Sequence, residues 1–212
     1  MICNICRSDN ASRFQTFDEK IYWKCSSCGC KYLDTAHLIN PQEEKKRYLE
    51  HNNDIHDKKY RSFLSKLSEP LKEKISVGAD GLDYGCGTGP ALADMLSKEG
   101  FSVSLYDPYF YPDKAVLSKQ YDFITCTETA EHFYDPFKEF NTFNDLLKPG
   151  GWLGIMTSFL TTDDKFENWY YRRDPTHVTF YCEKTFQVMA SQRDWTCEIR
   201  SKDVVLMQKN YD

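Results

Sequence analysis

The sequence predicts an α/β fold in which a doubly wound, mostly parallel sheet follows a small cysteine-rich unit and a helical linker. Three observations support this prediction. The run Leu82–Pro90 joins a short strand to a helix through three glycines at alternate positions. From Gly78 onward, strand patterns alternate with helix patterns, as a parallel doubly wound sheet requires. Two Cys-x-x-Cys pairs lie near the N-terminus. We therefore expect three units, over residues 1–35, 36–77 and 78–212.

Length and charge limit the class of protein. A chain of 212 residues can bury one sizeable core and carry a small appendage. The net charge of −5 gives no global electrostatic case for a nucleic-acid partner, although a local basic patch stays open. Arg7 and Asp9 follow the first residues too soon for a signal-peptide hydrophobic region, and no apolar run is long enough to cross a bilayer. We expect a cytoplasmic protein with no membrane partner.

The N-terminal cysteines have the spacing of a metal site. The chain has nine cysteines, an odd number that cannot all pair within it. Cys3-x-x-Cys6 and Cys25-x-x-Cys28 are separated by residues 7–24, which fits a four-cysteine zinc site. The intervening segment has too few apolar residues for a core, so zinc would have to hold it together. We expect a zinc ribbon with these four ligands and Cys30 as a spare thiol. Two disulfide or redox pairs are the alternative, although the strand-then-helix context of a redox motif is absent.

The linker has a helical pattern. Between Pro41 and Ile75, apolar residues recur at spacings of three and four, which predicts one or two amphipathic helices packed on the following domain. Pro70 is expected to start the last helical turn. The charged run Glu43–Arg47 is expected to be a solvated helix face.

The α/β elements follow in order. We expect a strand over 81–84, the glycine loop, a helix over 90–99 closed by Gly100, and a strand over 101–106. A further strand begins at Tyr121, and a helix then runs from Pro136 to Leu147. The turn 148–151 precedes a strand over 152–156.

The glycine loop has the composition of a nucleoside-cofactor site. Its glycines let the backbone turn sharply and approach a ligand, and Pro90 suits the first turn of a helix. A dinucleotide loop needs G-x-G-x-x-G, but the third glycine, Gly89, comes one residue early. Asp107 ends the next strand, about 20 residues beyond the glycines, where a carboxylate can accept hydrogen bonds from ribose hydroxyls. The alternative is a solvent-exposed Asp before a turn proline.

The loop, with Asp83 two positions before Gly85, resembles the first motif of class I S-adenosylmethionine-dependent methyltransferases. The strand from Tyr121, the Glu131-His132 pair, the following helix and the Pro-Gly-Gly turn resemble later landmarks of that family, so the resemblance covers about residues 80–182. It implies a Rossmann-like fold and S-adenosylmethionine as cofactor. The residues that it assigns to cofactor binding are Asp83, Gly85, Cys86, Gly87, Gly89, Asp107, Pro108, Thr127 and Glu128.

The sequence departs from the family between Asp107 and Asp122, where too few residues remain for the usual helix, third strand and adenine-binding loop. We expect an irregular connection or one short helix over 108–119. Tyr109, Phe110 or Tyr111 is expected to stack on the adenine.

Three residues are candidates for catalysis. His177 is the first candidate for a general base, because a neutral imidazole can take the proton released when a hydroxyl or amine attacks a methyl group. His132 is the rival, and Glu131 precedes it. The alternatives are a loop-holding role for His177 and helix capping for His132. Nearby side chains could wall a substrate pocket (Trp169, Tyr170, Tyr171) or pair with a carboxylate or phosphate of an anionic substrate (Arg172, Arg173).

The resemblance implies transfer of a methyl group from S-adenosylmethionine to an O, N or C nucleophile. A small-molecule acceptor is the leading hypothesis. An RNA or protein methyltransferase is the alternative, because zinc ribbons serve recognition in some ribosomal RNA methyltransferases, but the acidic charge disfavours nucleic acid. A non-catalytic cofactor-binding module is the third. Salt-dependent RNA binding would favour the RNA or protein methyltransferase, and failure to bind the cofactor would favour the non-catalytic module. No feature indicates an oligomeric state.

Overall fold

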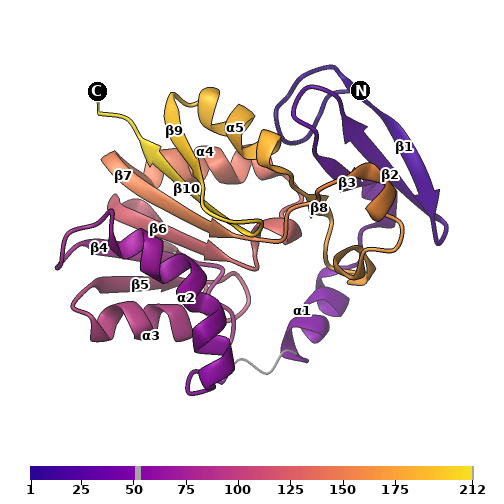
Figure 1. Ribbon diagram of the computed structural model, residues 1–212. Coiled ribbons are helices and arrows are strands. Elements are labelled where there is room, and N and C mark those ends of the chain that lie inside the picture. Colours follow the sequence, from indigo (N-terminus) through magenta and orange to yellow (C-terminus); the bar gives the residue numbers. More distant parts are fainter. Residues whose placement is uncertain (51–53, 212) are drawn as a thin grey trace.

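The computed structural model describes residues 1–50 and 54–211. Its central sheet has the strand order β5-β4-β6-β7-β10-β9 (Figure 1). The strands are β4 (Asp80–Tyr84), β5 (Ser102–Tyr106), β6 (Tyr121–Thr127), β7 (Leu147–Met156), β9 (Trp195–Ile199) and β10 (Val204–Lys209). The first four are parallel, and β10 runs antiparallel to both β7 and β9. The expected mostly parallel sheet is confirmed.

Helices cover both faces of this sheet (Figure 1). They are α2 (Lys58–Lys72) and α3 (Ala91–Lys98) on one face, and α4 (Pro136–Leu146) and α5 (Glu183–Ser191) on the other. Side chains alternate along each strand, so Leu206 packs in the core that contains Leu67 of α2, whereas Met207 packs in the core that contains Phe186 of α5. The result is a three-layer α/β arrangement.

The linker forms two helices, α1 (Pro41–Leu49) and α2. Asn40 and Glu43 form a capping box that starts α1. Pro70 lies in the last turn of α2, as expected. The expectation of a solvated face over 43–47 is wrong at Glu44, which is only 6% exposed because the hydroxyls of Tyr48 and Tyr109 donate hydrogen bonds to it.

The N-terminal unit is a small antiparallel sheet (Figure 1). It contains β1 (Ala11–Phe17), β2 (Lys20–Cys25), β3 (Lys31–Leu33) and, from the C-terminal half of the chain, β8 (Thr179–Phe180). Tyr32 of β3 pairs with Thr179 of β8. The N-terminal sheet is therefore completed by the segment that follows His177.

The connection after β5 is short, as expected. It contains one 3₁₀ helix, η2 (Lys114–Ser118), and no strand of the described residues pairs with the outer edge of β5. The strand expected over 152–156 begins earlier, because Leu147 already pairs with Tyr121 of β6. Residues 148–151 are therefore part of β7 rather than a separate turn. Among the helices of residues 1–50 and 54–211, none has the length and apolar character to cross a membrane.

Candidate active site

A cavity of about 1060 Å³ opens at the carboxyl ends of β4, β5 and β6. Its walls come from α1, α2, the glycine loop, the loop after β5 and the segment 170–177. The volume is slightly above the usual range of about 300–1,000 Å³ for one small-molecule site. In an open α/β sheet, this end of the strands is where ligands bind. Every residue that the sequence assigned to cofactor binding lines it: Asp83, Gly85, Cys86, Gly87, Gly89, Asp107, Pro108, Thr127 and Glu128.

The glycine loop turns sharply out of β4. Gly85 has φ +78°, and a Cβ there would lie 2.2 Å from Thr129 Cγ2, which no side chain could tolerate without a shift. Thr129 Oγ1 in turn donates a hydrogen bond to the Gly85 carbonyl at 3.1 Å. Gly87 also has positive φ. Backbone conformation therefore favours glycine at both positions, and Gly85 is required in addition by its close approach to the loop after β6.

Asp107 organises the loops beside it. Its Oδ2 accepts a hydrogen bond from Gly87 N at 3.1 Å, and its Oδ1 accepts from Tyr109 N at 2.8 Å and Phe110 N at 3.1 Å. The side chain is buried, so the alternative of a solvent-exposed Asp is wrong. An ionised carboxylate has about four acceptor positions, which leaves about one for a ligand.

Asp83 lies beneath the loop. It is 3% exposed, and its Oδ1 accepts a hydrogen bond from Thr125 Oγ1 of β6 at 2.7 Å. Burial and the charge of Asp107 raise the pKa of Asp83 to about 6, against the hydrogen bond from Thr125, which lowers it. Among the described residues, its hydrogen-bond partner is thus a side chain of β6.

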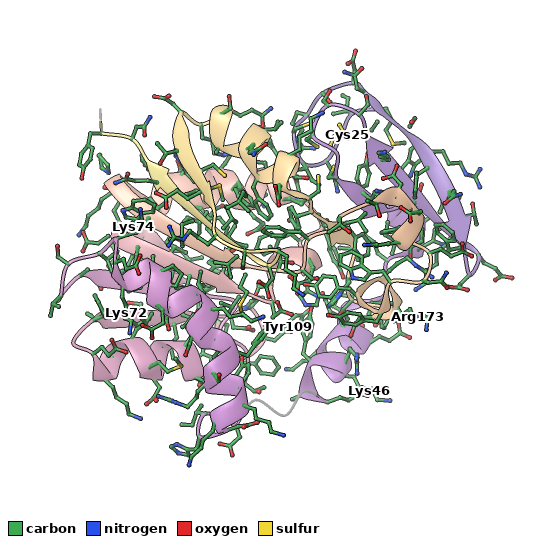
Figure 2. All side chains as sticks on the ribbon, viewed as in Figure 1. Cys25, Lys46, Lys72, Lys74, Tyr109 and Arg173 are labelled. Atoms are coloured by element: carbon green, nitrogen blue, oxygen red, sulfur yellow. The ribbon has the colours of Figure 1, made fainter. Side chains whose placement is uncertain are left out.

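Two of the three aromatic residues proposed for adenine stacking line the cavity, namely Tyr109 and Phe110. Tyr111 instead pairs through its backbone with Asp107. Tyr109 lies between the central sheet and α1 (Figure 2). Its hydroxyl donates to Glu44 at 2.6 Å, and its ring centroid is 5.6 Å from that of Tyr48.

The loop after β6 carries a strained acidic residue. Glu128 has φ +47°, a conformation that L residues rarely adopt, and its N–H donates to the Met156 carbonyl at 2.7 Å. Its side chain faces the cavity. Although the residue is exposed to the open cavity, desolvation by the surrounding walls, chiefly, and the charges of Glu131 and Asp203 raise its pKa. Such strain is concentrated at functional sites.

The three candidate catalytic residues, Glu131, His132 and His177, line the same cavity. The two imidazole centroids are 4.8 Å apart, and His177 Nε2 lies 4.0 Å from Glu131 Oε1. Burial lowers the pKa of His177, outweighing the opposing effect of the Glu131 charge. His132 does not cap a helix, because the cap of α4 is Asp135. His177 does hold its loop, since its Nδ1 bonds to the Tyr171 carbonyl at 2.7 Å.

The expectation that five aromatic and basic residues line the substrate pocket is wrong for two of them. Tyr170, Tyr171 and Arg173 line the cavity, but Trp169 and Arg172 do not. Arg172 is 6% exposed, and its guanidinium donates to Tyr22 Oη, to Asp18 and to the Glu167 carbonyl, so it ties the segment to the N-terminal sheet. Figure 2 shows Arg173 on the side of α1.

Sequence reasoning missed the contribution of the linker helices. Glu44, Arg47 and Tyr48 of α1, with Tyr60 and Phe63 of α2, line the cavity. The only sequence signal is the four-residue spacing of Glu44 and Tyr48, which a helix brings together. Arg47 also pairs with Asp174 at 2.8 Å, which joins α1 to the segment before His177.

A second cluster lies in the N-terminal unit, where the cavity does not reach. The sulfur atoms of Cys3, Cys6, Cys25 and Cys28 are buried and lie within 4.8 Å of one another. Cys30, the expected spare thiol, lies beside this cluster, with its sulfur 3.2 Å from that of Cys28 and 3.6 Å from that of Cys3. All nine thiols are free of disulfides.

Comparisons with known proteins identify the family and the fold of this chain. Ubiquinone biosynthesis O-methyltransferases of Salmonella strains are 32% identical over an aligned region that covers 33% of this chain and 38% of theirs. The chain thus matches less than half the length of these relatives. Two solved structures from Burkholderia thailandensis share the fold with a TM-score of 0.53 each. One is an O-methyltransferase family protein, 18% identical, with coverage of 80% of this chain and 63% of that one.

The other is 1,6-didemethyltoxoflavin-N1-methyltransferase bound to 1,6-didemethyltoxoflavin and S-adenosylhomocysteine, 14% identical, with coverage of 95% of this chain and 100% of that one. At these identities the two structures show the fold alone. The methyltransferase domain family model matches residues 48–198, which is most of the chain. The chain therefore belongs to the methyltransferase domain family.

Proposed function

We infer that this protein transfers a methyl group from S-adenosylmethionine to a small-molecule acceptor. One observation carries the inference: the glycine loop, Asp107 and the Glu131, His132 and His177 cluster line a single cavity at the carboxyl ends of the parallel strands. Membership of the methyltransferase domain family supports it.

The cavity fits the cofactor. The remaining acceptor position of Asp107 can bind a ribose hydroxyl, and the rings of Tyr109 and Phe110 offer apolar surface for the adenine. The glycine loop brings backbone close to the methionine part. When bound, the cofactor supplies a sulfonium methyl that carries its own leaving group. The protein must mainly orient the acceptor and exclude water, which is the role of α1 and α2 over the cavity.

The acceptor side lies at Glu131, His132 and His177. Since a carbonyl can only accept, the Nδ1 of His177 must donate to Tyr171 O, and the lone pair of Nε2 is available to take a proton from an acceptor hydroxyl or amine. The names of the relatives support a small-molecule acceptor, because they include an O-methyltransferase of ubiquinone biosynthesis and an N1-methyltransferase of a toxoflavin precursor. Arg173, at the cavity wall, would pair with an anionic group of such an acceptor.

Calorimetry with S-adenosylmethionine and S-adenosylhomocysteine tests this function. We expect both to bind, and Asp107→Ala to weaken binding at least tenfold. Asp107→Asn is the matched variant, because an amide oxygen can still accept from Tyr109 N while the amide nitrogen cannot accept from Gly87 N. If neither S-adenosylmethionine nor S-adenosylhomocysteine bound to folded, zinc-loaded protein, the methyltransferase function would be excluded and a non-catalytic role would remain.

We further propose that the cysteine cluster holds a structural zinc ion through Cys3, Cys6, Cys25 and Cys28. A Zn–S distance of about 2.3 Å in a tetrahedral site requires sulfur separations of about 3.8 Å. The separations of Cys3 from Cys28, 3.9 Å, and of Cys6 from Cys25, 3.6 Å, fit that requirement. Zinc would stabilise the unit against which α5 packs, where Thr185 Oγ1 donates to the Cys28 carbonyl at 3.0 Å.

A further inference from the structure

Three side chains at the acceptor side of the cavity present the donor set of a metal site. One oxygen of Glu131 and one nitrogen each of His132 and His177 lie within 4.8 Å of one another. Two imidazoles and one carboxylate are a known ligand set for divalent transition metals, which leaves further coordination positions open. These side chains come from two segments, η3 (Ala130–His132) and the loop before β8, which pack together at Val178 N and the Glu131 carbonyl.

The two imidazoles are oriented as metal ligands usually are. His132 Nδ1 bonds to the Thr176 carbonyl at 2.9 Å, and His177 Nδ1 bonds to the Tyr171 carbonyl at 2.7 Å. Because a carbonyl oxygen only accepts, each Nδ1 carries the proton and each Nε2 keeps a lone pair. Histidines that bind metals nearly always donate their other ring N–H to a carbonyl or carboxylate in this way. Both free lone pairs belong to rings that line the cavity.

Glu131 supplies an independent observation. Its side chain is 0% exposed. Oε2 accepts a hydrogen bond from Thr157 Oγ1 at 2.9 Å, but buried Oε1 has no hydrogen-bond partner among residues 1–50 and 54–211. The nearest basic atom is His177 Nε2, and their separation of 4.0 Å is too long for a hydrogen bond. A buried carboxylate oxygen without a hydrogen-bond partner costs folding free energy. A group that bonds to both Glu131 Oε1 and His177 Nε2 would remove that desolvation cost.

We propose that Glu131 Oε1, His132 Nε2 and His177 Nε2 bind a divalent transition metal ion. The ion bridges the gap between Glu131 and His177 and neutralises the buried carboxylate, for which no Lys or Arg in the described part of the chain provides an ion pair. Mixed nitrogen and oxygen ligands suit Mn²⁺, Fe²⁺ or Zn²⁺, whereas the all-sulfur cluster in the N-terminal unit selects Zn²⁺. The two sites therefore differ in the ions that they prefer.

The open coordination positions face the cavity, so they favour an acceptor with one or two oxygen donors. A hydroxyl bound there loses its proton more readily, because the ion stabilises the oxyanion. When the ion is bound, His177 Nε2 is a ligand and cannot be the general base described for the metal-free site, so the proton of the hydroxyl passes to water in the cavity. This role in methyl transfer rests on the proposed function, but binding of the ion does not.

Manganese binding tests the site without any methyl transfer. Tag-free protein that carries one zinc ion per chain, as atomic absorption verifies, is titrated with Mn²⁺ while electron paramagnetic resonance measures the free ion. We expect one Mn²⁺ per chain and a dissociation constant at least tenfold larger in His132→Gln and in His177→Gln. His56→Gln is the matched control, since His56 is exposed and does not line the cavity, and it should bind Mn²⁺ as the parent does.

Spin-echo spectroscopy of the parent protein keeps the test valid if a variant fails to fold. Imidazole nitrogen bound to Mn²⁺ modulates the echo, and this modulation is the expected result. Three results would overturn the proposal: no binding of Mn²⁺, equal binding to the parent and all variants, or an echo without nitrogen modulation. Each would mean that water rather than a metal ion lies between Glu131 and His177. Because no S-adenosylmethionine is present, these outcomes are independent of whether the protein methylates anything.

Discussion

Tyr109, in the loop after β5, donates a hydrogen bond at 2.6 Å to Glu44 of α1. The same carboxylate accepts a second hydrogen bond at 2.7 Å from Tyr48. The contact joins a linker helix to the loop that Asp107 organises, so α1 and the proposed cofactor side of the cavity form one structure.

Tyr109→Phe should lower stability, because it deletes one hydrogen bond to a buried carboxylate. We expect the free energy of unfolding in urea to fall by about 1.5 kcal/mol. Tyr211→Phe is the control, since Tyr211 is 77% exposed, and it should leave the midpoint unchanged. Equal stability of the two variants would show that Glu44 does not hold α1 to this loop.

Gly85→Ala should be much more harmful than Gly78→Ala, although both glycines have positive φ. At Gly78 nothing lies within 4 Å of an added Cβ, so only backbone strain of about 1 kcal/mol is expected. At Gly85 the Cβ would also meet Thr129 at 2.2 Å, and we expect a loss of at least about 3 kcal/mol. Urea unfolding of the two variants provides the comparison, and equal losses would contradict the clash.

Asp83→Asn should change how stability depends on pH. Burial, chiefly, gives Asp83 a pKa of about 6 in the folded protein, above its usual 3.8, so the folded state binds more protons between these values. Stability contributed by the protonated group is therefore present at low pH and is lost as pH rises from about 4 to 6, by roughly 3 kcal/mol. Asn cannot ionise and still accepts from Thr125 Oγ1.

The measurement is the free energy of unfolding at several pH values over this window, parent against variant. The curve of the variant should be flatter by the stated amount. Parallel curves would mean that Asp83 titrates in the folded state as it does in the unfolded chain.

Cys25→Ser should remove the zinc ion of the cysteine cluster, that is one zinc ion per chain, if the proposed ligand set is right, and thermal stability should fall with it. Cys197→Ser is the control, because Cys197 lies in β9 outside the cluster. Cys30→Ser should retain zinc, since Cys30 is not among the proposed ligands. Metal content by atomic absorption separates the three, and loss of zinc in Cys30→Ser would place Cys30 among the ligands.

The sheet and most of the candidate site were predictable because their signals are local. The glycine loop, Asp107 and the Glu131-His132 pair each follow a strand, and strand ends meet at one edge of a parallel sheet. His177 was a candidate from its imidazole chemistry alone, and its contacts with Glu131 and Tyr171 became visible only in the structure.

What the sequence did not show depends on contacts between distant segments. In the sequence, Arg172 cannot be distinguished from its neighbour Arg173. In the structure, the guanidinium of Arg172 donates hydrogen bonds to Asp18 and Tyr22 of the N-terminal unit. Glu44 sits in a charged run, yet two tyrosine hydroxyls make its burial favourable. Such choices are decided by packing, which no periodicity in the sequence records.

The pairing of β3 with β8 has a consequence for the order of assembly. During synthesis, the first three strands of the N-terminal sheet emerge long before Thr179 and Phe180, so that sheet stays incomplete until most of the chain has left the ribosome. Closing so large a loop makes this a late, non-local step. The cysteine unit is therefore not a detachable module: separating it from the rest of the protein would remove its fourth strand and, from the cavity wall, the support of the segment that carries His177.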